Sequence, residues 1–268
     1  MQQPFRIYYL NNMNSATSLS HFLYPTFTRI KHELKIPSEA PITIYLCASE
    51  QQYNALTSNA LPEWSAGAAI PSQRTIVLKT YQPYPELHTT AVHELVHIMV
   101  HSIINKPIPR WFDEGLAVYY SDDKVLASRS LVSKALLSNS IIALSDIDRV
   151  LSFDQTKAHL AYQESYLTIL FLVDKYGIEK LNQLIYAIND APTLDDAFQQ
   201  TLGIDLWDFE LAWFKYIQKR HRWNFLADID NYLWIIILGI FLVGFISIRF
   251  RNWKTIKRWE QEEENELW

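Results

Sequence analysis

The stretch "AVHELVHIMV", residues 91–100, places two histidines four residues apart in a strongly apolar segment. In an α-helix, side chains four residues apart differ by about 40° around the axis and about 6 Å along it. The imidazoles of His93 and His97 could therefore bind one ion. Glu94 is offset by about 100° from His93, so we do not expect it to be a ligand. It can instead reach a water beside the ion, which is the position of a general base.

The helix that carries this motif is predicted to be buried, because apolar residues surround the motif on most sides. Buried histidines and a buried glutamate are costly unless they are paired or bound to a metal. The alternative is a core helix whose two histidines are satisfied by hydrogen bonds. His101 repeats the spacing, but it lies about 12 Å along the axis from His93, too far to share an ion. We expect His101 at the surface or just behind the site.

A third donor is expected in "PRWFDEGLAVYY", residues 109–120, where Pro109 suits the start of a helix. Asp113 and Glu114 lie in its first turns. The intervening chain is long enough to end one helix, turn at "NKPIP" and return antiparallel, so a carboxylate here could face the histidine pair. The alternative is an exposed acidic pair, which a helix start favours anyway. Gly115 is unfavourable inside a helix, and a close approach of two backbones would explain it.

The order of elements predicts an α+β fold, with a small N-terminal sheet and its helices followed by a helical part that carries the site. The pattern places strands first and opens with a βαβ-like unit. Strands are predicted at 5–10, 41–47, 66–71 and 75–79. Helices are predicted at 15–34, 49–56, 86–104, 110–121, 127–138, 157–176, 178–189, 193–201 and 205–222.

Composition excludes several classes of protein. The chain has 268 residues, 49% of them hydrophobic, which is enough for a substantial core. A net charge of −5 gives no basic footprint for nucleic acid, so no nucleic-acid partner is expected. The single cysteine, Cys47, excludes an intrachain disulfide and a cysteine-rich metal site, and is expected to be a buried, inert thiol.

Residues 232–248 carry no charge and would span about 25 Å as a helix, which predicts a single transmembrane helix. The alternative is a buried C-terminal helix. The expected organisation is a globular domain at 1–222, a juxtamembrane linker at 223–231, the span at 232–248 and a short charged tail at 249–268.

The flanks of this segment predict its orientation. A basic cluster follows it and favours a cytoplasmic tail, which places the globular domain on the outside of the cell membrane. The first 18 residues lack the basic and apolar regions of an export signal. Either the true start lies upstream, or the chain is tail-anchored with its domain inside. The position of the basic cluster favours the first. The cluster consists of Arg249, Arg251, Lys254, Lys257 and Arg258.

These motifs together resemble those of the gluzincin metallopeptidases, which include thermolysin and the aminopeptidase N-like enzymes. The resemblance rests on His93–Glu94–x–x–His97, then Glu-Gly-x-Ala from Glu114, preceded by an aromatic at Trp111. It covers roughly residues 5–220 and is strongest with the bacterial peptidase MA-like group. It implies Zn²⁺ bound by His93, His97 and Glu114, with Glu94 as the base and a peptide or protein as substrate. Asp113 stands where the family usually has another residue, so it is not assigned as a ligand.

The stretch "YQESYLTILFL" resembles an aminopeptidase-like motif in which a tyrosine opens a helix and its hydroxyl stabilises the oxyanion. The resemblance assigns that role to Tyr162. The alternative is that Tyr162 only packs. The stretch "SAGAAIP", residues 65–71, stands where those aminopeptidases carry a glutamate that holds the substrate amine, and it contains no acid. It could still bind a peptide backbone by edge pairing. An endopeptidase, or a hydrolase of another substrate, is therefore favoured over an aminopeptidase.

The leading hypothesis is a membrane-anchored zinc metallopeptidase. A second hypothesis is a catalytically inactive, zinc-stabilised membrane module that binds peptides, and a third is a membrane interaction protein without metal. The presence of Glu94 favours the first, because a purely structural zinc site would not need a base. Bound zinc would separate the third from the other two.

Overall fold

A four-stranded sheet forms the N-terminal part of the chain, in the strand order β1-β2-β4-β3. β1 (Phe5–Tyr8), β2 (Ile42–Cys47) and β4 (Thr75–Lys79) are parallel, and β3 (Gly67–Ile70) pairs antiparallel with β4. The parallel pair β1 and β2 is joined through the helix α1 (Met13–Glu33), which is the expected βαβ-like opening. Antiparallel β3 is left as one edge of the sheet.

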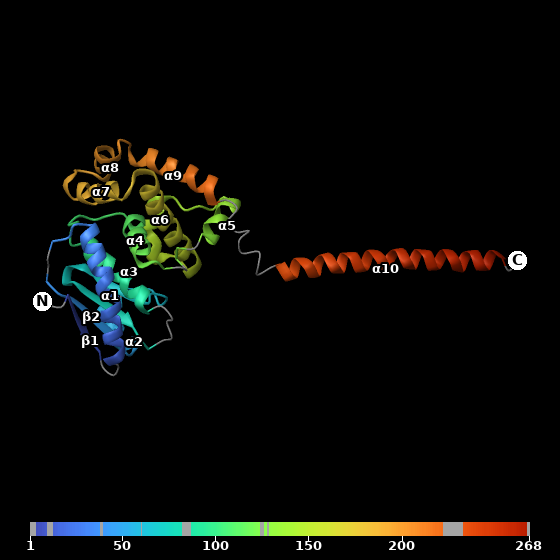
Figure 1. The fold of residues 1–268 in the computed structure, drawn as a ribbon, viewed down its shortest axis with the longest axis horizontal. Helices are drawn as coiled ribbons and strands as arrows, with labels where there is room; N and C mark the ends of the chain where they lie inside the picture. Colours follow the sequence, from blue (N-terminus) through green and yellow to red (C-terminus); the bar gives the residue numbers. More distant parts are fainter. Residues whose placement is uncertain are drawn as a thin grey trace. The chain divides into compact units, whose positions relative to one another are not determined.

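The structure is a computed structural model. It describes residues 4–9, 13–37, 40–59, 61–81, 87–123, 126–127, 129–221 and 233–266. From residue 87 the described chain is helical apart from its connections. Figure 1 shows the sheet at the blue end and the helices that follow it. The remaining helical elements are α2 (Glu50–Thr57), the 3₁₀ turn η1 (Pro71–Gln73), α3 (Leu87–Val100), α4 (Arg110–Ser121), α5 (Ser130–Ser138), the 3₁₀ segment η2 (Leu144–Ser152), α6 (Gln155–Tyr176), α7 (Ile178–Asp190), α8 (Leu194–Leu202), α9 (Leu206–His221) and α10 (Leu233–Glu266).

The two faces of the sheet are covered by different helices. α1 and α3 pack on one face through fully buried residues such as Leu23, Leu95 and Leu78. α2 packs on the other, where Tyr53 and Cys47 form a smaller cluster with neighbouring strand residues. Cys47 is a free, buried cysteine, and burial raises the pKa of its thiol, as expected for an inert residue.

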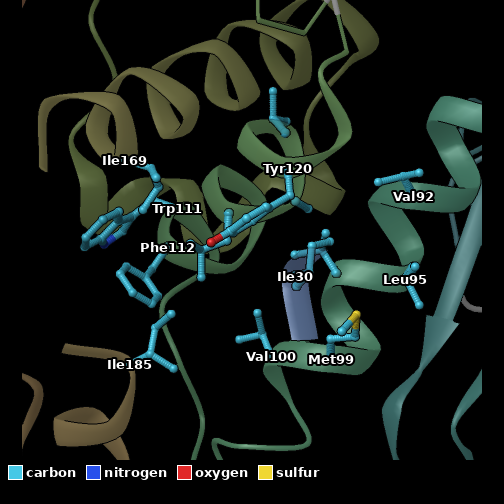
Figure 2. Packing of buried hydrophobic residues seen from close by; sticks show 14 of the residues in the cluster. Ile30, Val92, Leu95, Met99, Val100, Trp111, Phe112, Tyr120, Ile169 and Ile185 are labelled. Atoms are coloured by element: carbon cyan, nitrogen blue, oxygen red, sulfur yellow. The ribbon is translucent and has the colours of Figure 1, made fainter. Parts of the chain in front are cut away.

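A single apolar core continues from the sheet into the helical part. α3 is apolar around most of its circumference, so it is buried on several sides at once. α4 lies between α3 and α6 and contacts both closely. Figure 2 shows side chains from several helices meeting in this core. They include Ile30 of α1, Met99 of α3, Trp111 of α4, Ile169 of α6 and Ile185 of α7.

Contacts group the chain into two compact units, Met1–Arg222 and Trp223–Trp268. Within the described residues, one helix is long and apolar enough to cross a membrane, over Ile235–Trp259. Its described side chains up to Trp259 are almost all exposed, whereas a soluble core helix would be buried. α10 also continues through the basic cluster as one helix.

The α+β class and the single C-terminal apolar helix are as predicted. Most boundaries differ from the predicted ones by three residues or fewer, and the helix predicted at 86–104 ends earlier, at Val100.

Candidate metal centre

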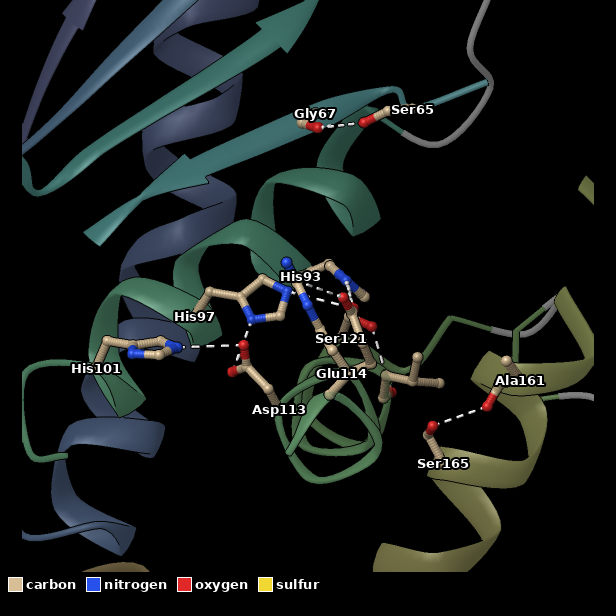
Figure 3. A network of polar contacts seen from close by, with 12 residues as sticks. Ser65, Gly67, His93, His97, His101, Asp113, Glu114, Ser121, Ala161 and Ser165 are labelled. Atoms are coloured by element: carbon tan, nitrogen blue, oxygen red, sulfur yellow. Dashed lines mark hydrogen bonds and ion pairs between the residues drawn. The ribbon is translucent and has the colours of Figure 1, made fainter. Parts of the chain in front are cut away.

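The Nε2 atoms of His93 and His97 both face one oxygen of Glu114. Both lie on α3, one turn apart, and their ring centroids are 5.0 Å apart. His93 Nε2 is 3.1 Å from Glu114 Oε2, and His97 Nε2 is 3.5 Å from the same oxygen. Figure 3 shows the two rings and this carboxylate converging between α3 and α4. The structure therefore brings together all three donors expected from the sequence.

Glu114 reaches this point because α4 returns beside α3 and packs closely between α3 and α6. A Cβ atom added to Gly115 would lie 2.5 Å from the backbone oxygen of Ser165 on α6, which is closer than real Cβ contacts come. The glycine therefore permits the close approach of backbones that its position in a helix predicted. Glycine here sets the depth of α4 and thereby the reach of the adjacent Glu114.

Asp113 serves the opposite side of His97. Its Oδ1 is 2.9 Å from His97 Nδ1, and its Oδ2 is 3.2 Å from His101 Nε2 (Figure 3). A carboxylate that accepts the Nδ1 proton fixes the tautomer in which Nε2 keeps a lone pair for a metal ion. This arrangement is usual for metal-binding histidines. Asp113 thus orients His97 and cannot share its metal-facing nitrogen. His101 lies just behind the site, one of the two positions expected for it.

The buried charges of this cluster are mutually dependent. Burial alone would raise the pKa of Glu114, but the adjacent histidines, chiefly His97, outweigh it and lower that pKa to about 2. The same opposition lowers the pKa of Asp113 and raises that of His97 in the metal-free chain. A metal ion would displace the His97 proton and take over its role of balancing the carboxylates.

Glu94 lies between the histidine pair and the edge strand. Its side chain is buried, and a Cβ atom added to Gly67 of β3 would be 2.9 Å from Glu94 Oε1. Figure 3 shows Gly67 at the start of the strand, and Ser65 just before it, above the helix that carries the histidines. Burial raises the pKa of Glu94, opposed by His93 and His97. A carboxylate whose pKa is raised beside the histidine pair is better suited to accept and return a proton than an exposed one.

Tyr162 also lies at the centre, inside the helix predicted at 157–176, whereas the resembled motif has its tyrosine at a helix start. It stands about two turns inside α6, which begins at Gln155, and so does not open the helix. Its ring centroid is 6.2 Å from that of His93 and 6.4 Å from that of Trp64. Burial, with Glu114 and Glu94 nearby, raises the pKa of Tyr162 well above its usual value. The hydroxyl therefore keeps its proton and can donate a hydrogen bond.

These groups line one pocket of about 400 Å³. Sequence reasoning missed several of its residues, because they reach the site from separate segments and carry no local motif. Its edge-strand wall uses alternate residues, whose small side chains leave room beside Glu94. The additional lining residues are Leu61, Trp64, Ser65, Gly67, Ala69, Pro71, His101, Pro107, Ile108, Arg110 and Leu151.

The donor set fits a catalytic metal. One atom from each of His93, His97 and Glu114 lies within 4.8 Å of the others, so the three residues could hold an ion. Two imidazoles and one carboxylate form a donor set that zinc accepts, and three protein donors leave a further position for water or substrate. That position faces the pocket, since all three residues line it. The orienting carboxylate of Asp113 is a further feature of metal-binding histidines.

Comparison with known proteins agrees with this geometry. A search of curated proteins gives no match. The family model of the Peptidase MA superfamily matches residues 25–219, which contain all of α2 to α8, most of α9 and every group of the centre. The match extends over well more than half of the chain, and the chain belongs to the Peptidase MA superfamily.

Proposed function

We propose that the protein is a membrane-anchored, zinc-dependent metallopeptidase that cuts peptide bonds within a chain. The observation that carries this proposal is the convergence of two histidine Nε2 atoms on Glu114 Oε2, with Glu94 buried beside them on the pocket side. A site that only held zinc would need no such carboxylate. We assign His93, His97 and Glu114 as zinc ligands and Glu94 as the general base.

When bound, zinc supplies Lewis acidity to the scissile carbonyl and to the attacking water. Glu94 accepts the proton of that water and then delivers it to the leaving amine. Its position next to Gly67 of β3 suits both transfers, because a peptide paired with the edge of this strand would lie in the pocket that Glu94 lines. Tyr162 keeps its proton at neutral pH and donates a hydrogen bond to the oxyanion that develops on the substrate.

The open edge of β3 supports a peptide substrate. Lys79 N–H donates to Ala66 C=O, and hydrogen-bonded pairs alternate along an antiparallel ladder. Ala69 is therefore a residue whose N–H and C=O point away from β4. A substrate could add as a further strand there. The strand carries no acid to hold a free α-amine, which favours internal cleavage over removal of N-terminal residues.

We further propose that residues 1–222 form the catalytic domain and that residues 232–248 cross the cell membrane. The linker at 223–231 joins them, and the charged tail at 249–268 lies in the cytoplasm, so that the catalytic domain is extracytoplasmic. The exposed apolar side chains on α10 support a membrane span. The basic cluster after them supports the orientation. Reporter fusions at the C-terminus test it. If an export-dependent reporter is active at the C-terminus, the orientation is the opposite of the proposed one.

The function itself is tested with purified protein and a mixed library of blocked and unblocked peptides. We expect internal cuts that stop when a chelator removes the metal and resume when zinc is restored. Mass spectrometry would identify both the bound metal and the cut positions. Full zinc binding with no cleavage of any peptide would instead support an inactive, zinc-stabilised module that binds peptides.

A further inference from the structure

Arg110 stands at the mouth of the catalytic pocket, one turn of α4 before Glu114. Its backbone N–H donates to Asp148 Oδ1 at 2.8 Å, which fixes the start of the helix. Its side chain is 41% exposed and lines the pocket. Its Nη1 lies 3.4 Å from Oε1 of the proposed ligand Glu114, so the guanidinium lies within one or two substrate residues of the proposed metal position.

The guanidinium retains most of its hydrogen-bonding capacity. An arginine carries five N–H donors. In the part of the chain that the structure describes, its acidic contact is a single long one, from Nη1 to Glu114 Oε1 at 3.4 Å. Several donors of a permanent cation are therefore available to a ligand.

The rest of the pocket makes this cation distinctive. Among the described residues that line it, Arg110 is the one lysine or arginine. Its neighbours in the wall include the apolar Ile108 and Leu151. A planar guanidinium binds a carboxylate through two parallel hydrogen bonds, and apolar walls strengthen that attraction.

We propose that Arg110 forms a carboxylate-binding subsite, so that preferred substrates carry a carboxylate within one or two residues of the scissile bond. The carboxylate is either an Asp or Glu side chain, which fits cleavage within a chain, or the free C-terminus of the peptide, which would move the cut next to that end. The inference rests on the proposed peptidase function and names the substrate class of the same site.

A competing role for Arg110 is to position Glu114. The two roles differ in what they affect. Loss of a positioning contact would weaken zinc binding and would affect acidic and neutral peptides equally. Loss of a carboxylate subsite would remove the preference for acidic peptides and leave zinc binding intact.

The test measures peptide binding to the zinc-loaded Glu94→Gln protein, so that it does not depend on turnover. One arm compares N-acetylated Ala/Phe tetrapeptides that end in a free carboxylate or in an amide. The other compares amidated hexapeptides in which Glu or Gln occupies each internal position in turn. Arg110→Gln and Arg110→Lys are tested in the same background. Arg149→Gln, at an exposed arginine outside the pocket, is the matched control.

In at least one arm, we expect the acidic peptide to bind about tenfold more tightly than its neutral partner. Arg110→Gln should bring that ratio near one, Arg110→Lys should retain part of it, and the control should retain all of it. Zinc content should be equal in all proteins. The responding arm identifies the source of the carboxylate.

An acid-to-neutral ratio near one in the Glu94→Gln protein, or one that survives Arg110→Gln, would overturn the subsite. So would an equal loss of acidic and neutral binding together with zinc, or no measurable binding of any acidic peptide. The proposed function fails separately. If wild type cleaves the library but shows no preference for acidic peptides, the peptidase function stands and the subsite is refuted. If acidic peptides bind through Arg110 but wild type cleaves nothing, the subsite stands and the peptidase function is refuted.

Discussion

The metal centre and the interior of α6 both bury a glutamate, but they hold it in opposite states. Glu114 lies against two histidines, and the pKa of its carboxyl falls to about 2. Glu164 is fully buried in α6, where both oxygens lie 3.2 Å from the backbone N–H of Ile142. Burial raises the pKa of Glu164 well above its usual value, and one backbone donor opposes this only in part.

The difference teaches what separates a chemical site from a structural one in this fold. Burial acts on both carboxyls in the same direction, so the neighbours decide the outcome. The acid surrounded by imidazoles stays ionised and can serve as a donor to a cation. The acid whose partner among the described residues is a backbone amide has a raised pKa, which favours its protonated form as a hydrogen-bonded part of the core.

The largest expected effect comes from making the same substitution at both glutamates. Glu114→Gln should weaken zinc binding by more than about 100-fold, beyond the 10–100-fold typical of residues behind the ligands. Glu164→Gln should leave zinc affinity unchanged. Competition with a chelator of known affinity measures both. Equal zinc affinity in the two variants would remove Glu114 from the site.

A smaller loss is expected at the carboxylate behind His97. Asp113→Asn keeps the shape of the side chain but removes the charge that fixes the His97 tautomer. We expect zinc affinity to fall about 10–100-fold. Asp146→Asn, at an exposed aspartate on η2, serves as the control. A loss as large as that of Glu114→Gln would indicate that Asp113 is itself a ligand.

The sequence predicted the donors because helical spacing is a local property. His93 and His97 share a face whatever surrounds them, and Gly115 signalled the contact that places Glu114. The strand at 66–71 was likewise predictable from its small residues and its turn. The fold class followed from the order of strands and helices.

What the sequence could not predict depends on packing between distant segments. The contact of Asp113 with His97 Nδ1 requires the exact turn between α3 and α4. The resemblance assigned Tyr162 to the site, but the packing of α6 brings it there from inside the helix, whereas the resembled motif has its tyrosine at a helix start. Trp64 enters from a separate segment and Arg110 lies one turn before Glu114 on α4, but no local pattern marks either of them as a pocket residue.

Alanine substitution at two glycines compares stability with activity. Gly115→Ala places a Cβ against the Ser165 backbone, so α4 and α6 must separate. The gain in helix propensity is smaller than the cost of overpacking, and we expect a net loss of about 1–2 kcal/mol in the free energy of unfolding. Gly67→Ala meets the side chains of Thr90 and Glu94, which can move. It should reduce hydrolysis with little change in stability.

Thermal unfolding and peptide turnover of both glycine variants provide the measurement. Unchanged stability of Gly115→Ala would show that the helices are not held together as closely as described. Unchanged peptide turnover of Gly67→Ala would show that the close contact between β3 and Glu94 is not needed for hydrolysis.

The smallest effect is a pH dependence at Glu164. Its pKa is raised in the folded chain, so the folded state binds more protons than the unfolded state above pH 4.5, and stability falls as pH rises through the folded pKa. Glu164→Gln lacks this loss. The stability of the variant relative to wild type should therefore increase between about pH 5 and pH 8. Melting temperatures of both proteins across that range measure it, and a difference independent of pH would contradict it.

The central claim is that Glu94 moves a proton beside a zinc ion held by its neighbours. Glu94→Gln is nearly isosteric and removes no proposed ligand, so the measurement is zinc content and peptide turnover of this variant beside wild type. We predict one zinc per chain in both proteins. We predict that turnover in the variant falls by about two to four orders of magnitude. Full activity in Glu94→Gln would contradict the mechanism, and loss of zinc together with activity would make Glu94 a structural part of the site.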